Sequence, residues 1–146
     1  MSVYKKVFID TAPFIYLMES HPLFYDKMEC FLSYCRENDI AIVTSVISYM
    51  EFSIKPYELG RIEAIEDFKE MLIDLNVQIY DINLKISDIA AQIRASNLKF
   101  RQIDSLQLAT AIYSESRIFV TNDKQLKSFK KLKIVLVDDL SKIVNS

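Results

Sequence analysis

Acidic side chains that follow short apolar runs are the residues of this sequence best suited to do chemistry. Asp10 comes directly after the run 7–9, and Asp123 comes shortly after the run 118–120. Nearly all-apolar runs are typical of buried parallel strands, and ligands bind beyond the carboxyl ends of such strands. Both carboxylates are therefore candidates for one site, although each on its own could serve only as a cap or turn residue.

Two further acids lie in helical patterns. Glu51 falls within the apolar stretch 46–52, where a charged side chain is costly unless it has a partner. Asp104 opens a four-residue stretch that ends in Gln107, a spacing typical of a capping box, so we expect Asp104 to cap a helix. The remaining strand-end acids are expected to cap turns: Asp81, Asp138 and Asp139.

Residue counts exclude several other chemistries. Gly60 is the single glycine, whereas a Walker A loop and a GxGxxG turn each need several. His21 is the single histidine and the two cysteines form no CxxC pair, which argues against zinc and against a Ser-His-Asp triad. Cys30 and Cys35 lie in a helical pattern and point in different directions, so we expect two free, buried thiols. Carboxylate chemistry remains open.

The elements that would position these residues alternate between strand and helix along the whole chain. Strands are expected over residues 7–9, 40–43, 77–80, 118–120 and 134–137. Helices are expected over residues 11–18, 23–38, 45–54, 62–75, 84–93 and 104–114, with a loop over 55–60 and a short lysine-rich helix before the last strand. Helical crossovers between apolar strands require a mostly parallel sheet that is covered on both faces. We therefore predict one domain over residues 1–146, an α/β protein with a three-layer α/β/α sandwich.

Four short motifs, in this order, resemble those of the PIN-domain nucleases, and among them the VapC-like toxins of toxin–antitoxin pairs. The matching stretches are Val7-Phe8-Ile9-Asp10-Thr11, residues 44–51, residues 100–111 and Phe119-Val120-Thr121-Asn122-Asp123. The resemblance covers nearly the whole chain, apart from a segment over residues 57–74 that matches no motif. Gln107 and Leu108 depart from the family pattern, where small or aliphatic residues are more usual. We expect this departure to affect helix packing more than chemistry.

The resemblance implies a metal-dependent endoribonuclease with a PIN-like fold. Asp10, Glu51 and Asp104 would hold a Mg²⁺ or Mn²⁺ ion, and Asp123 would complete a second metal position or orient the attacking water. The side chains implied to support these ligands are Thr11 and Asn122. Oxygen ligands suit such hard ions, and carboxylates crowded in one cleft repel one another unless a cation neutralises them. The implied products carry 5′-phosphate and 3′-hydroxyl ends. The implied partners are an RNA substrate, a small antitoxin protein and a second copy of the chain in a homodimer.

The formal net charge of −2 conceals an uneven distribution. Residues 1–90 carry 8 basic and 15 acidic side chains, whereas residues 91–133 carry 9 basic and 3 acidic side chains. A polyanion such as RNA would meet the second segment, although a solvated helical face would have the same composition. The basic side chains expected to contact RNA are Arg94, Lys99, Arg101, Lys124 and Lys127.

Other functions fail on particular residues or remain open. A receiver domain would need an acidic pair after the first strand and a lysine after the last, but here Asp10 is followed by Thr11 and Val137 is followed by Asp138. A haloacid-dehalogenase-type phosphatase would need Asp-x-Asp after the first strand, but the sequence has Asp10-Thr11-Ala12. A housekeeping RNA-processing nuclease would share the same site, and a non-catalytic binding module would keep the fold without cleaving. The longest apolar run, 14–18, is too short for a membrane helix and no signal-peptide core is present, so we expect a cytoplasmic protein.

Overall fold

The fold is that of a computed structural model, which describes residues 4–145. Within these residues the strands are β1 (Lys6–Ile9), β2 (Ala41–Ser45), β3 (Gln78–Tyr80), β4 (Ile118–Thr121) and β5 (Lys133–Leu136). The α-helices are α1 (Thr11–Met18), α2 (Tyr25–Glu37), α3 (Val46–Glu58), α4 (Ile62–Asp74), α5 (Leu84–Ser96), α6 (Gln102–Tyr113) and α7 (Ser141–Val144). Two short 3₁₀ helices, η1 (Lys124–Ser128) and η2 (Val137–Asp139), flank β5. The predicted strands are confirmed, with ends shifted by one or two residues.

The strands form one parallel sheet in the order β3-β2-β1-β4-β5. The first strand lies at the centre, where Phe8 pairs with Val43 of β2 on one side and with Phe119 of β4 on the other. The chain adds β2 and β3 on one side of β1, and then crosses over to add β4 and β5 on the other side. Such a switch in strand order opens a crevice between the carboxyl ends of the two strands that flank it, here β1 and β4.

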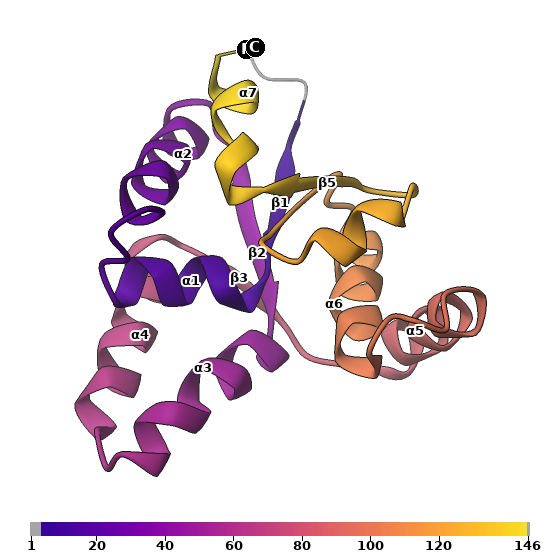
Figure 1. The fold of residues 1–146 in the computed structure, drawn as a ribbon, viewed down its shortest axis with the longest axis horizontal. Helices are drawn as coiled ribbons and strands as arrows, with labels where there is room; N and C mark the ends of the chain where they lie inside the picture. Colours follow the sequence, from indigo (N-terminus) through magenta and orange to yellow (C-terminus); the bar gives the residue numbers. More distant parts are fainter. Residues whose placement is uncertain (1–3, 146) are drawn as a thin grey trace.

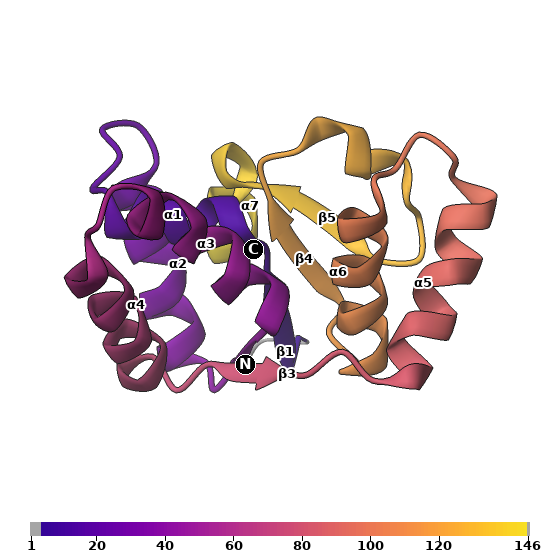
Figure 2. The same cartoon turned by 90° about the horizontal axis from the view of Figure 1, so that it is seen from below.

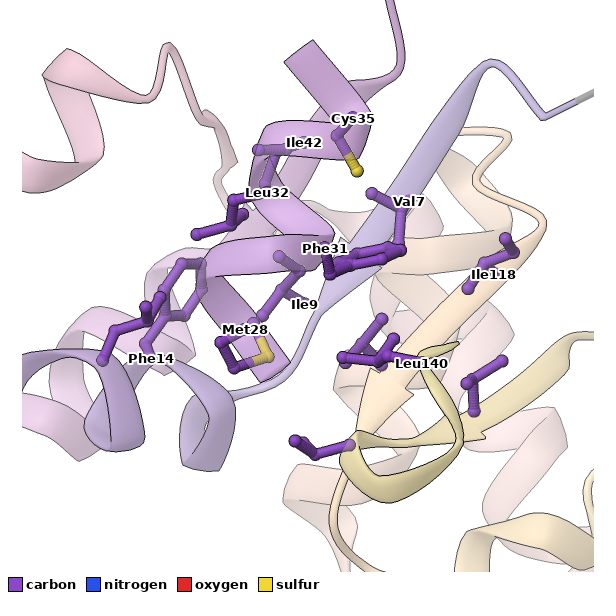
Figure 3. Close-up of a cluster of buried hydrophobic side chains, with 14 of the residues drawn as sticks. Val7, Ile9, Phe14, Met28, Phe31, Leu32, Cys35, Ile42, Ile118 and Leu140 are labelled. Atoms are coloured by element: carbon purple, nitrogen blue, oxygen red, sulfur yellow. The ribbon is translucent and has the colours of Figure 1, made fainter. Parts of the chain in front are cut away.

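Helices cover both faces of the sheet, which confirms the predicted three-layer architecture. Helices α1 to α4 lie on one side with α7, and α5 and α6 lie on the other (Figures 1 and 2). The alternation of side chains along β1 divides the core, since Val7 and Ile9 belong to the first cluster and Phe8 to the second. Figure 3 shows the first cluster, where Phe31 of α2 packs over the sheet. On the other face Phe8 stacks on Phe119 with ring centroids 5.0 Å apart.

Helix α3 is longer than the sequence predicts, because it continues through Pro56 into the predicted loop over residues 55–60. Pro56 lies in the last turn, where its missing N–H removes a single helical hydrogen bond. The helix ends in a Schellman motif at Gly60, which has φ of +68°. The Gly60 N–H donates to the carbonyl of Tyr57 (3.2 Å), and the Arg61 N–H donates to the carbonyl of Pro56 (2.8 Å). The loop prediction is therefore wrong over its first residues, and the glycine marks the true end of the helix.

Helix α6 begins before Asp104, so the predicted cap is also wrong. Arg101 is the N-cap residue, and Asp104 lies at the third helical position, where its carboxylate accepts the backbone N–H of Arg101 (3.1 Å). Asp104 therefore occupies the position of the acid in a capping box. Gln107, the expected partner in the predicted box, is buried inside the protein instead.

Both cysteines are free, as predicted, but only one of them is buried. Cys35 lies in the first core cluster, and burial raises the pKa of its thiol to about 12. Cys30 is exposed on the outer side of α2, so the prediction of two buried thiols is wrong for this residue. No helix within residues 4–145 has the length and apolar character needed to cross a membrane.

Candidate active site

One pocket at the carboxyl edge of the sheet collects most of the predicted site residues. It has a volume of about 530 Å³ and lies where β1 and β4 end. Three of the four predicted acids line it: Asp10 after β1, Glu51 on α3 and Asp123 after β4. The other polar residues that line it are Thr11, Tyr16, Arg101, Thr121 and Asn122. We call this hollow the acidic pocket.

Asp10 is held by donors from three elements. Its carboxylate accepts the backbone N–H of Thr11 (2.9 Å), which caps α1, and also the Thr121 hydroxyl (2.9 Å) and the Gln107 amide (3.3 Å). Burial raises the pKa of Asp10 above its ordinary value of 3.8, the three hydrogen bonds oppose this shift, and the negative charge of Glu51 adds to it. The Asp10 carboxylate is therefore fixed in place, and a nearby cation would favour its charged form.

Glu51 reaches the acidic pocket from α3 and finds a hydroxyl partner on α1. Thr11 Oγ1 donates to Glu51 Oε1 at 2.6 Å, and Thr11 itself is buried in the first turn of α1. This contact satisfies the requirement that a charged residue in an apolar helical stretch has a partner. No residue within 4–145 donates to the second carboxylate oxygen of Glu51, which leaves that oxygen available to a ligand.

Asp104, the fourth predicted acid, does not line the acidic pocket. Arg101 holds both of its oxygens in a bidentate pair, from Nε to Oδ2 at 3.2 Å and from Nη2 to Oδ1 at 3.0 Å. This pair raises the pKa of Arg101, and the charges of Glu51 and Asp123 raise it further. Arg101 is thus the cation that pairs with Asp104 and partly offsets the charges of Glu51 and Asp123. Among the residues that the structure describes, no three His, Cys, Asp or Glu side chains are placed to hold one metal ion together.

The turn after β4 positions Asp123 and Asn122. The Asp123 N–H donates to Thr121 Oγ1 (3.1 Å), and the Asp123 carboxylate accepts the N–H of Gln125 (3.0 Å), which caps η1. Asn122 Nδ2 donates to the hydroxyl oxygen of Tyr16 (2.8 Å). Asn122 therefore ties the turn to α1, and it contacts Tyr16 rather than one of the acids.

Gln107 is the site residue that sequence reasoning missed. Its Nε2 donates to Ser48 Oγ (2.8 Å) as well as to Asp10, and its Oε1 accepts the Ser45 hydroxyl. Ser48 Oγ in turn lies 2.8 Å from Thr44 Oγ1, which donates to the backbone carbonyl that precedes Asp10. One amide thus joins α6, α3 and the end of β1.

A signal for this role exists in the sequence. Gln107 stands between Leu106 and Leu108, and an amide in the apolar interior of a helix must find hydrogen-bond partners. It also lies three residues after Asp104, close to the same helical face. Gln107 is buried, as a packing role requires, and it also donates a hydrogen bond to the candidate ligand Asp10 (3.3 Å).

The donor set of the acidic pocket suits a hard divalent cation. Every candidate ligand is an oxygen atom, and neither a histidine nor a cysteine is among the residues that line the pocket. Three carboxylates line the pocket against one guanidinium, so its side chains keep a net negative charge. A Mg²⁺ or Mn²⁺ ion therefore fits the chemistry of the side chains present.

The five basic residues expected to contact RNA are scattered. Arg101 lines the acidic pocket. Lys124 and Lys127 lie on η1, which begins directly after the pocket, and Lys127 Nζ is 3.8 Å from an acid of η2. Lys99 is exposed in the turn before α6, and Arg94 is half-buried beside the groove between α5 and α6. Of the five basic residues, which were predicted from their closeness to the acids in the sequence, only Arg101 is among the described residues that line the acidic pocket.

The acids that were expected to serve as turn residues lie outside the acidic pocket. Asp138 and Asp139 are in η2, where Asp138 pairs with Lys27 and Asp139 pairs with Lys142 (3.2 Å). Asp81 is exposed after β3. These contacts give the three carboxylates structural partners or solvent, and none of them adds to the charge of the pocket.

Comparisons with known proteins identify the family and the fold. The PIN domain family model matches residues 7–132, a range that contains all four candidate acids. Similar solved structures include VapBC2 from Rickettsia felis bound to a promoter DNA fragment (18% identity, TM-score 0.75, 90% of this chain and 98% of that chain covered) and a toxin–antitoxin complex from Klebsiella pneumoniae (17%, 0.67, 90% and 97%). Another is Mycobacterium tuberculosis VapC20, described as a sarcin-ricin loop cleaving toxin (11% identity, TM-score 0.66, 85% of this chain and 95% of that chain covered).

At these identities the structural likeness establishes the fold alone, and no curated protein sequence matches the chain. The family model is the stronger finding, because it spans most of the chain and includes the strands and helices that carry the acidic pocket. The protein belongs to the PIN domain family.

Proposed function

We propose that this protein is a metal-dependent endoribonuclease that hydrolyses RNA phosphodiester bonds at the acidic pocket. The observation that carries the proposal is the convergence of Asp10, Glu51 and Asp123, from three separate elements, in one pocket. Carboxylates gathered in a partly desolvated site repel one another, so their convergence favours a site that binds cations. Membership of the PIN domain family supports nuclease chemistry.

Asp10, Glu51 and Asp123 would supply oxygen ligands to a Mg²⁺ or Mn²⁺ ion. Among the described residues no three acids already surround one point, so these side chains would move toward the ion as it binds. When bound, the ion would polarise the phosphodiester and lower the pKa of an attacking water. Thr11 would orient Glu51 through its 2.6 Å hydrogen bond, and Gln107 would orient Asp10 through its amide. Such supporting contacts keep the ligand oxygens in position and reduce the reorganisation needed during the reaction.

Arg101 would bind the scissile phosphate and release Asp104. In the free protein the guanidinium is paired with Asp104, and phosphate oxygens are equally good bidentate partners. An RNA phosphate could therefore take over the guanidinium and leave the Asp104 carboxylate free to join the other ligands. In hydrolysis the water oxygen bonds to phosphorus, the bond to the 3′-oxygen breaks, and that oxygen is protonated. The products carry 5′-phosphate and 3′-hydroxyl ends.

We further propose that the protein is the cytoplasmic toxin of a toxin–antitoxin pair and forms a homodimer. The support is its likeness to a toxin–antitoxin complex and to a sarcin-ricin loop cleaving toxin. Growth arrest on expression, relieved by a small protein encoded beside it, is the expected result. A housekeeping nuclease of the same fold would cut RNA without such a partner. Light scattering of the purified chain tests the dimer.

Cleavage of a labelled total-RNA pool in Mg²⁺ or Mn²⁺ tests the nuclease. We expect discrete cuts that disappear with EDTA and with Asp10→Asn, and that persist in the matched control Asp81→Asn, which changes an exposed acid outside the pocket. Cutting that persists in Asp10→Asn would place the active groups elsewhere. A folded protein that neither cuts RNA nor binds Mn²⁺ would contradict the catalytic proposal and leave a binding module.

A further inference from the structure

A second hollow lies at the opposite, amino-terminal edge of the sheet. It has a volume of about 700 Å³ and is lined by four cationic side chains, Lys5, Lys6, Arg117 and Lys131, and by one acid, Glu115. Lys6 begins β1 and Arg117 precedes β4, whereas the acidic pocket lies at the carboxyl ends of the same two strands. We call this hollow the basic pocket.

The parallel sheet brings these cations together. Val7 pairs with Ile118, so the residues that precede them, Lys6 and Arg117, stand side by side at the edge. Lys133 begins β5 next to them, and its N–H donates to the carbonyl of Arg117 (2.9 Å). Like charges held this close repel one another, and the repulsion is relieved when an anion binds between them.

Part of this charge has no partner in the protein. Lys6 Nζ donates to the carbonyl of Ser114 (3.0 Å), which fixes its position at the rim. Within residues 4–145, the side chains of Lys5, Arg117 and Lys131 make no ion pair or hydrogen bond. An arginine and two lysines, free to turn toward a common point, suit the oxygens of a phosphate group.

A line of lysines connects the basic pocket with the acidic pocket. Because β4 and β5 are parallel, the segment between them must run from the carboxyl edge of the sheet to the amino edge, and Figure 2 shows it running from η1 to the start of β5. Lys124 and Lys127 are three residues apart on a 3₁₀ helix, which places them on the same face. Lys130 follows after three more residues, and its Nζ donates to the carbonyl of Lys127 (3.0 Å). Lys131 then lies in the basic pocket.

The acidic pocket needs binding energy from elsewhere. It presents three carboxylates against a single guanidinium, and phosphate contacts from basic side chains supply most of the affinity of a protein for nucleic acid. Strand β4 and its flanks, from Arg117 to Asp123, separate the two pockets by about 20 Å, since each of the six steps along the chain adds about 3.3 Å. An RNA strand several nucleotides long spans this distance.

We propose that the basic pocket is a second RNA-binding site, which holds phosphates of the same strand whose scissile bond lies in the acidic pocket. The segment from Lys124 to Lys130 is the path of the RNA between them. This inference rests on the proposed ribonuclease function. It commits the basic pocket to a polynucleotide, and makes RNA length a determinant of affinity.

Binding of a short RNA (about two nucleotides), which cannot reach both pockets, and of a long RNA (about 20 nucleotides) tests the proposal by fluorescence anisotropy over a range of salt concentrations. Arg117→Glu and Lys131→Glu are placed in the Asp10→Asn background, which prevents cleavage. Arg61→Glu is the matched control, because it makes the same charge reversal at an exposed residue before α4. Thermal unfolding by circular dichroism verifies that each variant is folded.

We expect each change in the basic pocket to weaken long-RNA binding about fivefold or more, and to lower the salt slope by about 0.7 for each lost phosphate contact. Binding of the short RNA and the behaviour of Arg61→Glu should not change. Equal binding of long RNA by all variants would overturn the proposal. So would variants that bind RNA normally but bind a polyglutamate peptide more weakly, because that result would assign the basic pocket to an acidic protein partner. Separate cleavage assays distinguish the two proposals. If the wild type cuts RNA but its RNA affinity does not depend on the basic pocket, only the proposal of a second RNA-binding site is refuted. If RNA affinity depends on the basic pocket but no RNA is cut, only the proposed nuclease activity is refuted.

Discussion

Replacing Gln107 by methionine should destabilise the protein and alter Asp10 at the same time. Methionine keeps the length and flexibility of the side chain but removes the amide, so three hydrogen bonds disappear: those to Asp10, Ser45 and Ser48. A typical net value of about 1 kcal/mol for each bond gives a loss of about 3 kcal/mol in the free energy of unfolding. For a chain of this size, that corresponds to a fall in Tm of about 6–12 °C.

The same substitution should raise the pKa of Asp10 further. Burial already raises it, and the Gln107 amide is one of the donors that stabilise the charged form. An NMR titration of the Asp10 carboxyl carbon measures this pKa, and thermal unfolding measures the stability. Gln102→Met on the exposed side of α6 is the matched control, for which a change within about 0.5 kcal/mol is expected. A Gln107→Met protein with the Tm of the wild type and an unchanged Asp10 pKa would refute this account of the network.

Three other predictions follow from particular contacts. Arg101→Gln removes both guanidinium hydrogen bonds to Asp104 and, with them, a positive charge that competes with a metal ion. Calorimetry should therefore show that Mn²⁺ binds several-fold more tightly to the variant. Weaker binding would show that Arg101 supports the metal site. Because the folded-state pKa of Asp10 is raised, the stability associated with its protonated form is lost as pH rises from 3.8 through that pKa. Over this pH range the Tm of the metal-free wild type should fall relative to that of Asp10→Asn. The increase in Tm caused by Mn²⁺ should become larger over the same range, because more Asp10 is charged. A Mn²⁺ effect that does not depend on pH would exclude Asp10 as a ligand. Gly60→Ala should cost about 1 kcal/mol by thermal unfolding, because φ is +68° although nothing lies within 4 Å of an added Cβ; an unchanged Tm would mean that the turn relaxes.

Much of the fold could be predicted because its signals are local. The apolar runs around Phe8 and Phe119 indicated strands covered on both faces, and the two core clusters confirm this. Helix ends were less predictable, because they depend on contacts that a pattern does not contain. Pro56 remains in α3 because it lies in the last turn, where the loss of one hydrogen bond is tolerated. The N-cap of α6 is Arg101 rather than Asp104.

The candidate site was predictable only in part. Strand ends located Asp10 and Asp123, since the edge of a parallel sheet collects such residues. The position of Asp104 was not predictable, because its closest partner is a neighbour in the sequence whose side chain folds back onto it. Gln107 was missed because its role depends on two serines that lie about 60 residues earlier in the chain, at separations of 59 and 62 residues.

The division of charge between the two edges of the sheet links these observations. The carboxyl edge holds Asp10, Glu51 and Asp123 around one guanidinium, and the amino edge holds four cations around one acid. Arg101 pairs with Asp104 and partly offsets the charges of Glu51 and Asp123, which helps the fold to accommodate these acids. Under the two proposals above, an RNA substrate would interact with both edges: it would compete with Asp104 for Arg101 at the first and be attracted by the cations of the second. The proposed RNA substrate would give the charge asymmetry between residues 1–90 and 91–133 a function, which a merely solvated basic face would not have.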